Sequence, residues 1–272
     1  MFYPACSRLL AGIGFIAFFC PSSPSLAQPT LGTAADFAVL GGSTVTNTGA
    51  TVVNGELGVS PGSSVTGFPP GIVMPPGTIH LADGVAGQAQ TDLTTAYNGI
   101  TGMPALVDLT GTDLGGLTLT PSVYGFTSSA TLTGTLTLDA QGDPNAIFIF
   151  KIGSSLTTAS NSSVLVINGG SDCNVFWQVG SSATLGTTST LAGNILALTS
   201  ITLNTGAGLS GRALARNGAV TLDGNSVAIC PSAGPPVVNA LSIPTLSQWG
   251  LVILIALTGL VPICYLRRRT QS

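Results

Sequence analysis

Threonine recurs at regular intervals in the second half of the chain, each time directly before a leucine. The leucines Leu185, Leu203 and Leu222 lie 18 and 19 residues apart. A period of roughly 20 with three short strands per repeat is typical of a solenoid, of which a triangular β-helix is the simplest form. Because side chains alternate along a strand, the leucines should point inward and the preceding threonines outward, as a column of hydroxyl and methyl groups. These threonines are Thr184, Thr202 and Thr221.

The same alternation extends the outward column to other short segments of the chain. Threonine is stiff at χ1, stacked coils lie about 4.8 Å apart, and alternate residues on a strand lie about 6.6 Å apart. The column would therefore be a rigid grid with almost no long charged side chains. An ordinary β-solenoid surface is the alternative, because threonine is favoured in strands anyway. The candidate residues are Thr44, Thr46, Thr66, Thr131, Thr133, Ser155, Thr157, Thr184, Thr202, Asn204 and Thr221.

Residues that could perform catalysis are not grouped in the sequence. A β-helix that cleaves polysaccharides needs clustered carboxylates with a basic residue or a metal, but the acidic residues are scattered over expected loops and caps. A Ser or Thr nucleophile needs a base, and His80, the only histidine, has no evident triad context. Without a CxxC motif, the sequence also predicts no metal site and no cofactor. The acidic residues are Asp36, Glu56, Asp83, Asp92, Asp108, Asp113, Asp139, Asp143, Asp172 and Asp223.

The charge balance limits the possible partners. Only 6% of the 272 residues are charged, whereas soluble domains usually carry about a quarter. Between the two hydrophobic ends, Lys151, Arg212 and Arg216 face ten acidic residues, which leaves a net charge of −7. This charge argues against nucleic acid or an anionic membrane surface as partner. We expect a monomeric domain over 28–230, large enough to bury a core.

The N-terminal segment has the features of a secretory signal. Residues 1–27 contain Arg8 near the start, an apolar stretch from Leu9 to Cys20, and a small-x-small site ending at Ala27. This pattern predicts a signal peptide that is removed before Gln28. An uncleaved membrane anchor is the alternative.

The C-terminal segment has three parts after a Pro-rich linker at 231–242. Residues 243–272 comprise a polar head, an apolar stretch at about 249–266 that can just span a bilayer, and three arginines that should stay cytoplasmic. This arrangement resembles the bacterial sorting signals that begin Ile-Pro-Thr-Leu. The resemblance implies recognition and cleavage by a membrane sortase-like enzyme, and export to the bacterial cell surface or beyond. A plain single-span anchor is the alternative. The motif residues are Ile243, Pro244, Thr245 and Leu246.

Two cysteines remain in the domain when both ends are set aside. Cys173 and Cys230 would be exported to an oxidising compartment, where pairing is expected. A bridge would tie the loop at 169–174 to the end of the last coil. Two buried free thiols are the alternative.

One segment has helical instead of strand-like spacing. Apolar residues recur every three or four positions between Asp83 and Ile100, Asp83 is a plausible N-cap, and Gly102 with Pro104 should end the helix. We expect the helix to cover one face of the β-helix. The segment before it is rich in proline and should form a loop that cannot pair as a central strand. In the coils after it, Leu132, Leu156 and Leu185 are taken as stacked positions, 24 and 29 residues apart.

Several phrases of the sequence resemble the microbial ice-binding proteins of the discontinuous β-helix type. The resemblance covers about Leu31 to Ile229. It implies a right-handed parallel β-helix with a long helix alongside, in which the first strands return to complete coils beside the last ones. It also implies one flat face that adsorbs to ice. The phrases are LGTAADFAVLGGS from Leu31, AIFIFKI from Ala146, VFWQVGSSATLGT from Val175 and GRALARNGAVTLD from Gly211.

The threonine column suits this expected function. Each threonine offers a methyl and a hydroxyl, which can hold a partly ordered water layer that merges with an ice lattice. Gly186, Asn204 and Asp223 interrupt the ladder, so the sequence does not predict strong ice activity, although the expected fold is unaffected. A surface adhesin or structural protein of the extracellular matrix is the rival interpretation, because the sorting signal fits it equally well.

Overall fold

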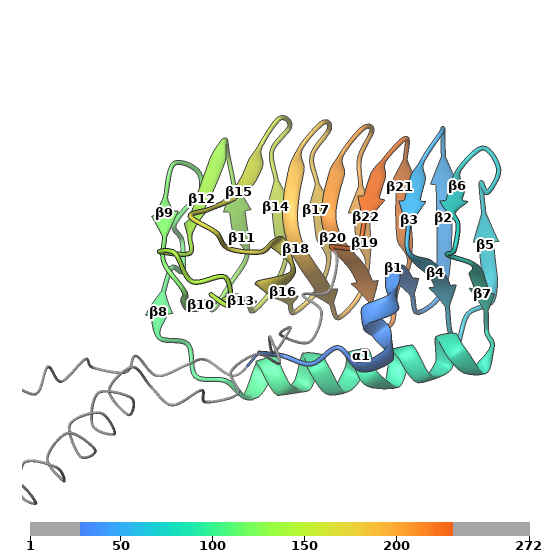
Figure 1. Ribbon diagram of the computed structural model, residues 1–272, viewed down its shortest axis with the longest axis horizontal. Coiled ribbons are helices and arrows are strands. Elements are labelled where there is room, and N and C mark those ends of the chain that lie inside the picture. The colour runs from blue at the N-terminus through green and yellow to red at the C-terminus, as the bar shows by residue number, and fades with distance from the viewer. Residues whose placement is uncertain (1–27, 231–272) are drawn as a thin grey trace, which may run out of the picture. The chain divides into compact units, whose positions relative to one another are not determined.

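The computed structural model describes residues 28–230. Short parallel strands wind into a solenoid with three faces, and one long helix runs beside it (Figure 1). Among these residues no helix is long and apolar enough to cross a membrane. The expected signal peptide, linker, sorting signal and membrane span lie outside the described residues.

The first face, here the helix face, is the one that the long helix α1 (Gly84–Gly102) covers. Its strands all run parallel and follow one another along the solenoid axis. In spatial order they are β8 (Val107–Asp108), β10 (Ser122–Phe126), β13 (Phe148–Ile152), β16 (Val175–Val179), the second halves of β18 (Thr190–Ala197) and β20 (Gly208–Ala215), β1 (Phe37–Gly41), β4 (Glu56–Val59) and β7 (Ile79–Leu81).

The second face, here the threonine face, is a separate 7-stranded parallel sheet. Most inward positions of its strands carry buried Ala, Val, Leu and Ile, with Thr158 of β14 as an exception, whereas outward positions are polar. In order the strands are β11 (Ala130–Leu132), β14 (Leu156–Thr158), β17 (Ala183–Leu185), β19 (Ile201–Leu203), β21 (Val220–Asp223), β2 (Thr44–Thr48) and β5 (Ser64–Thr66).

The third face is continuous with the helix face, because β18 and β20 each span both. These strands bend at Gly193 and Gly211, whose φ angles are +112° and +152°. A Cβ on Gly211 would lie 1.9 Å from the carbonyl oxygen of Gly193, so the corner requires glycine. The strands are β9 (Thr118–Leu119), β12 (Thr135–Asp139), β15 (Ser163–Ile167), the first halves of β18 and β20, β22 (Ser226–Ala228), β3 (Val52–Asn54) and β6 (Ile72–Met74).

The N-terminal coils extend the solenoid from its C-terminal end, as the resemblance implies. Val39 pairs with Ala213 on the helix face, and β2 and β3 stack on β21 and β22 in the same way. The Pro-rich segment forms the terminal coil, in which β6 is a short edge strand between two proline pairs. Proline is tolerated there because an edge strand leaves N–H groups unpaired.

The alignment of the earlier coils differs from the prediction. Leu156 pairs with Ala130 and Ala183, not with Leu132 and Leu185. The reason is that Thr158 occupies an inward position beside Leu132. It is 3% exposed, donates to Ser189 over 3.3 Å and accepts the Gly186 N–H over 2.9 Å. A buried threonine with partners thus replaces an expected leucine.

Aromatic side chains stack inside the solenoid. Tyr124, Phe150 and Trp177 stack across three coils with centroid distances of 5.3 and 4.0 Å. The Trp177 indole donates to the Ala192 carbonyl over 2.9 Å, so its only polar group is satisfied. Phe176, on the other side of the same strand, contacts the helix layer.

Helix α1 (Gly84–Gly102) confirms the helical prediction. Asp83 caps it by accepting the Ala86 N–H over 2.8 Å. The buried positions are those that the spacing indicated, and they pack on Leu40, Ile149 and Leu214 of the helix face. The short 3₁₀ helix η1 (Gly32–Asp36) joins this layer, and η2 (Asp172–Asn174) lies before β16. The buried helix residues are Ala86, Ala89, Leu93, Ala96, Tyr97 and Ile100.

The three basic residues of the described chain all contact α1 or η1 and hold these helices against the solenoid. Lys151 donates to the Thr101 carbonyl over 3.0 Å and to the Met103 carbonyl, at the C-terminal end of α1. Arg216 lies 4.7 Å from the centroid of the Tyr97 ring. Arg212, 5% exposed, donates to the Ala35 carbonyl over 2.7 Å. Positive charge within residues 28–230 is therefore confined to the helix side.

The disulfide is present. Cys173 and Cys230 are bonded, with their Cα atoms 5.5 Å apart and a sequence separation of 57. The bond ties η2 to the chain just after β22, at the end of the last C-terminal coil.

Replacing both Cys173 and Cys230 with serine should lower the free energy of unfolding by about 4 kcal/mol, because the bridge restricts the unfolded chain. The thermal midpoint should fall by roughly 10 °C while the far-ultraviolet β signal is retained. Thiol counting on the denatured, unreduced wild-type domain is the direct check, and two free thiols would contradict the account.

Candidate functional site

One continuous column of threonines crosses the whole threonine face. Each member pairs in register with the next, across all seven strands of the sheet. The column joins segments far apart in sequence, since the hydroxyls of Thr46 and Thr221 lie 3.4 Å apart. Every member was among the predicted candidates. In order the column is Thr131, Thr157, Thr184, Thr202, Thr221, Thr46 and Thr66.

A second column lies two residues before the first, on the strand at Thr44 and Ser64 and just ahead of the strand in the other five coils. Of its members, only Thr44 and Ser155 were predicted. The Ser129 and Ser155 hydroxyls lie 2.9 Å apart, so this column is also linked between coils. The missed serines could have been found by their constant offset from the threonines. The column consists of Ser129, Ser155, Ser182, Ser200, Ala219, Thr44 and Ser64.

The position two residues after the main column is irregular. The predicted candidates Thr133 and Asn204 fall here, together with the buried Gly186 and the half-buried Asp223. Asn204 begins the turn into the third face, because its carbonyl accepts the Ala207 N–H over 3.0 Å. These residues therefore border the two regular columns instead of extending them.

Asp113 closes the column at one end. It forms an isolated bridge beside Thr131, accepts the hydroxyls of Thr131 and Thr133 over 2.8 and 3.1 Å, and accepts the N–H groups of Gly115 and Thr133 over 2.7 and 3.0 Å. Partial burial raises the pKa of its carboxyl group, but these hydrogen bonds outweigh it, and the pKa is lowered. Asp113 is therefore ionised and fixes the first hydroxyls of the column.

Long charged side chains are absent from the described part of the threonine face. The basic residues lie on the helix side, and the two carboxylates nearest the columns, Asp113 and Asp223, both accept threonine hydroxyls. The surface is therefore a flat array of short side chains. Such an array can contact a rigid, extended partner over many equivalent points.

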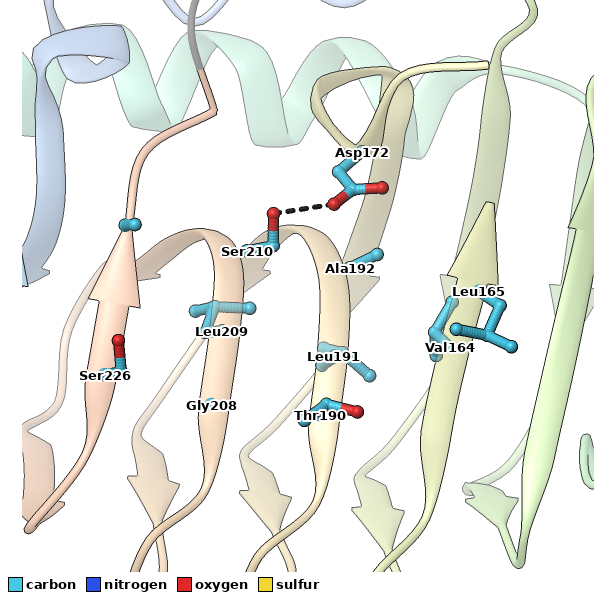
Figure 2. Close-up of a pocket in the computed structure, with 11 residues that line it drawn as sticks. Val164, Leu165, Asp172, Thr190, Leu191, Ala192, Gly208, Leu209, Ser210 and Ser226 are labelled. Carbon is cyan, nitrogen blue, oxygen red and sulfur yellow. Dashed lines mark hydrogen bonds between the residues drawn. The ribbon is translucent and has the colours of Figure 1, made fainter. Parts of the chain in front are cut away.

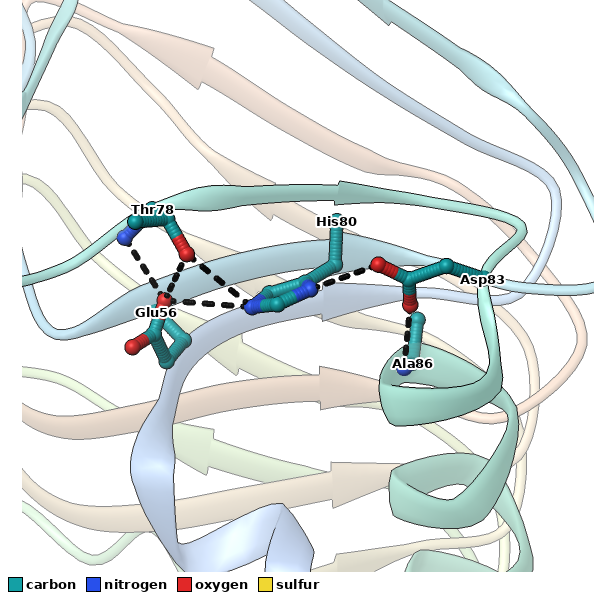
Figure 3. Close-up of polar contacts among 5 residues, drawn as sticks. All are labelled: Glu56, Thr78, His80, Asp83 and Ala86. Carbon is teal, nitrogen blue, oxygen red and sulfur yellow. Dashed lines mark hydrogen bonds and ion pairs between the residues drawn. The ribbon is translucent and has the colours of Figure 1, made fainter.

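His80 does have partners that the sequence did not indicate (Figure 3). Its Nδ1 lies 2.7 Å from Asp83, and its Nε2 lies 3.1 Å from the Thr78 hydroxyl and 3.4 Å from Glu56. The Thr78 hydroxyl donates to Glu56 over 2.8 Å, so it is not poised to donate to the imidazole. Hydrogen bonds from the Ala86 N–H and from His80 lower the pKa of Asp83. The contacts of His80 link β4, β7 and the start of α1, so this cluster has a structural role and holds the three elements together.

A shallow depression lies on the third face (Figure 2). Its floor is made of small residues such as Ala192 and Gly208, and Leu165 lies at one side. Its one carboxylate, Asp172, accepts the Ser210 hydroxyl over 2.6 Å. No group of three or more metal-ligating side chains occurs within residues 28–230. The threonine face is therefore the best-ordered candidate site.

Replacing Asp113 with alanine should lower the free energy of unfolding by about 1–2 kcal/mol near pH 7, because several hydrogen bonds to a carboxylate are lost. The folded-state pKa is depressed, so this stabilisation is present above the unfolded value of about 3.9 and is lost as pH falls through the folded value. Urea unfolding of both proteins near pH 7 and about pH 2 should show the difference shrinking at the lower pH. A constant difference would contradict the assignment.

Comparisons with known proteins agree with this geometry. An ice-binding protein from Nostoc sp. (strain HG1) is 65% identical over 198 residues, which cover 72% of each chain. The crystal structure of an ice-binding protein from an Antarctic biological consortium is 51% identical with a TM-score of 0.73, over 76% of this chain and 93% of that chain. One from the ascomycete Antarctomyces psychrotrophicus is 43% identical with a TM-score of 0.73, over 76% and 100%.

Two family models also match the chain. The ice-binding-like model matches residues 39–228, and the IPTL-CTERM motif matches residues 242–269. The first match spans well over half of the chain and coincides with the solenoid. This protein therefore belongs to the ice-binding-like family and carries a C-terminal IPTL-CTERM motif.

Proposed function

We propose that the protein binds ice through the threonine face and thereby inhibits ice growth or recrystallisation. The observation that carries the proposal is the register of the seven threonines across the face. Relatives described as ice-binding proteins are similar over nearly the whole solenoid. The rival interpretation as an adhesin has no comparable support.

The physical basis is a match between two ordered arrays. Backbone pairing sets coil spacing at about 4.8 Å, and strand geometry sets the separation of the two columns at about 6.6 Å. Threonine side chains are stiff at χ1, so little side-chain entropy is lost on adsorption. Each methyl excludes water from one side while each hydroxyl anchors it on the other. Water held in this way can join the lattice of an ice surface.

The electrostatics of the face fit the same role. A long charged side chain would bind its own hydration shell and disturb an ordered layer. The basic residues of the described chain are held on the helix side, where Arg216 lies on Tyr97 and Lys151 caps α1. The side that the proposal assigns to ice thus presents short side chains, and its two bordering carboxylates, Asp113 and Asp223, are held by threonine hydroxyls.

We propose further that the protein acts outside the cell. The IPTL-CTERM match at 242–269 supports recognition by a membrane sortase-like enzyme, and the composition of residues 1–27 supports export. A monomer suffices for adsorption, because one solenoid carries the whole face.

Replacing Thr202 with tyrosine should abolish most ice-growth inhibition. Thr202 lies mid-column, between Thr184 and Thr221, so a ring there would hold neighbouring threonines away from the ice front. Because the side chain points outward from the sheet, the free energy of unfolding should change by about 0.5 kcal/mol or less. Thermal hysteresis and recrystallisation assays, with a thermal melt, measure both effects.

Thr190→Tyr is the matched control, since Thr190 is exposed on the third face and the substitution is the same. It should leave ice activity unchanged. If Thr190→Tyr is the damaging change and Thr202→Tyr is harmless, the adsorbing face has been assigned wrongly. If the parent domain has no effect on ice, the proposed function fails.

Mass spectrometry of the protein from its host should find a mature chain that starts near Gln28 and has lost its tail around residues 243–249. Cleavage is expected because the IPTL-CTERM match begins at residue 242. Recovery of peptides that contain Arg267–Arg269 from the mature surface protein would show that the segment is a membrane anchor and not a cleaved sorting signal.

A further inference from the structure

The corner between the threonine face and the third face uses a left-handed residue in successive coils. The turns Ala159–Ser162, Gly186–Ser189 and Asn204–Ala207 each close by a hydrogen bond from the last N–H to the first carbonyl, over 3.3, 3.1 and 3.0 Å. In each turn the third residue has a positive φ. These residues are Asn161 (+59°), Thr188 (+54°) and Gly206 (+70°), and the same corner of other coils holds Gly134, Gly224, Gly49 and Gly67, also with positive φ.

The left-handed conformation has a clear structural purpose. It turns the N–H of the corner residue along the solenoid axis, toward a carbonyl of the next coil. Asn161 donates to Thr187 over 3.0 Å, and Thr188 donates to Thr205 over 3.0 Å. The pattern continues with Gly206, which donates to Asp223 over 3.0 Å. Glycine or asparagine suits this position, because neither meets the steric penalty of a β-branched side chain.

Thr188 is the exception to this rule. A β-branched residue in the left-handed region is strained, and such outliers often mark functional positions. Its hydroxyl donates to the Asn161 side chain over 2.6 Å, which offsets part of the strain. However, the backbone of the turn needs no threonine, since Gly206 makes the same inter-coil bond in the next coil.

The position of Thr188 indicates what the strained residue does. It lies four residues beyond Thr184, at the rim of the threonine face. Thr187, Thr188 and Thr205 are all exposed there and lie on adjacent coils. The rim therefore repeats the hydroxyl and methyl chemistry of the face at a different orientation.

We propose that Thr188 extends the adsorbing surface around this corner, so that the rim contacts ice together with the flat face. This inference rests on the proposed ice-binding function. It assigns a binding role to a residue that neither the periodic column nor its neighbouring serine column includes. The strained conformation is kept because the corner carries a binding group where the fold alone would place glycine.

The test is the substitution Thr188→Gly, followed by Thr188→Asn. Thr188→Gly should raise the thermal midpoint by about 2–4 °C, because strain is relieved. It should at the same time cause a partial loss of ice-growth inhibition, smaller than that of Thr202→Tyr. Thr188→Asn keeps a polar side chain that is compatible with the turn, and should show the same two effects because the methyl and the hydroxyl are both gone.

Gln141→Gly is the matched control, since Gln141 has a φ of +55° in the exposed loop after β12, away from the threonine face. It should raise the thermal midpoint without changing ice activity. If Thr188→Gly leaves ice activity intact while Thr202→Tyr abolishes it, the rim is no binding surface and only this inference falls. A lower midpoint for Thr188→Gly would show that the residue is structural. A parent domain without ice activity would overturn the proposed function itself.

Discussion

Hydrogen bonding between the backbones of successive coils sets the spacing of every side chain on the threonine face. Every strand of the threonine face pairs in parallel with its neighbours, so the outward residue of one coil lies over that of the next at a spacing of about 4.8 Å. The side chains themselves cannot set this spacing. Buried aliphatic residues fill most of the interior, and the aromatic stack of Tyr124, Phe150 and Trp177 fills three successive coils. Left-handed corner residues keep the ladder continuous between faces. The repeated backbone hydrogen bonds between coils thus give the threonine face a fixed period.

The distribution of charge follows from the same requirement. A negatively charged domain with three basic residues could have placed them anywhere on its surface. Instead, each lies against η1 or α1, where it binds a carbonyl or an aromatic ring. Burial lowers the pKa of Arg212, which stays charged at any ordinary pH. These cations stabilise the docked helix while leaving the threonine face without long side chains.

Strictly periodic features could be predicted from the sequence, whereas insertions and long-range contacts could not. The pairs Thr184–Thr202 and Thr202–Thr221 follow from a constant repeat and were placed correctly. The coils before them carry corner insertions, so Leu156 was aligned with the wrong partners. The inward Thr158 gave no sign of its burial, because its partner Ser189 belongs to another coil.

Contacts between segments far apart in sequence are the second kind of feature that the sequence did not predict. The neighbour of Thr221 is Thr46, 175 residues earlier, and only the family resemblance indicated that the first strands return there. His80 meets Glu56 across 24 residues, and no local pattern predicts that contact. The left-handed conformation of Thr188 could not be predicted either, because the residues next to it in sequence do not indicate one. Local periodicity thus predicts the secondary structure and the central part of the threonine column, whereas the His80 cluster and the rim depend on contacts between residues far apart in sequence.

We expect the backbone register to make the threonine face rigid enough to order water. An atomic-resolution diffraction structure of the domain, collected at low temperature, measures this most directly. Ranks of well-ordered waters are expected between the threonine and serine columns, repeating with the coil spacing of about 4.8 Å. Waters on this face that are no more ordered or periodic than those on the third face would contradict it.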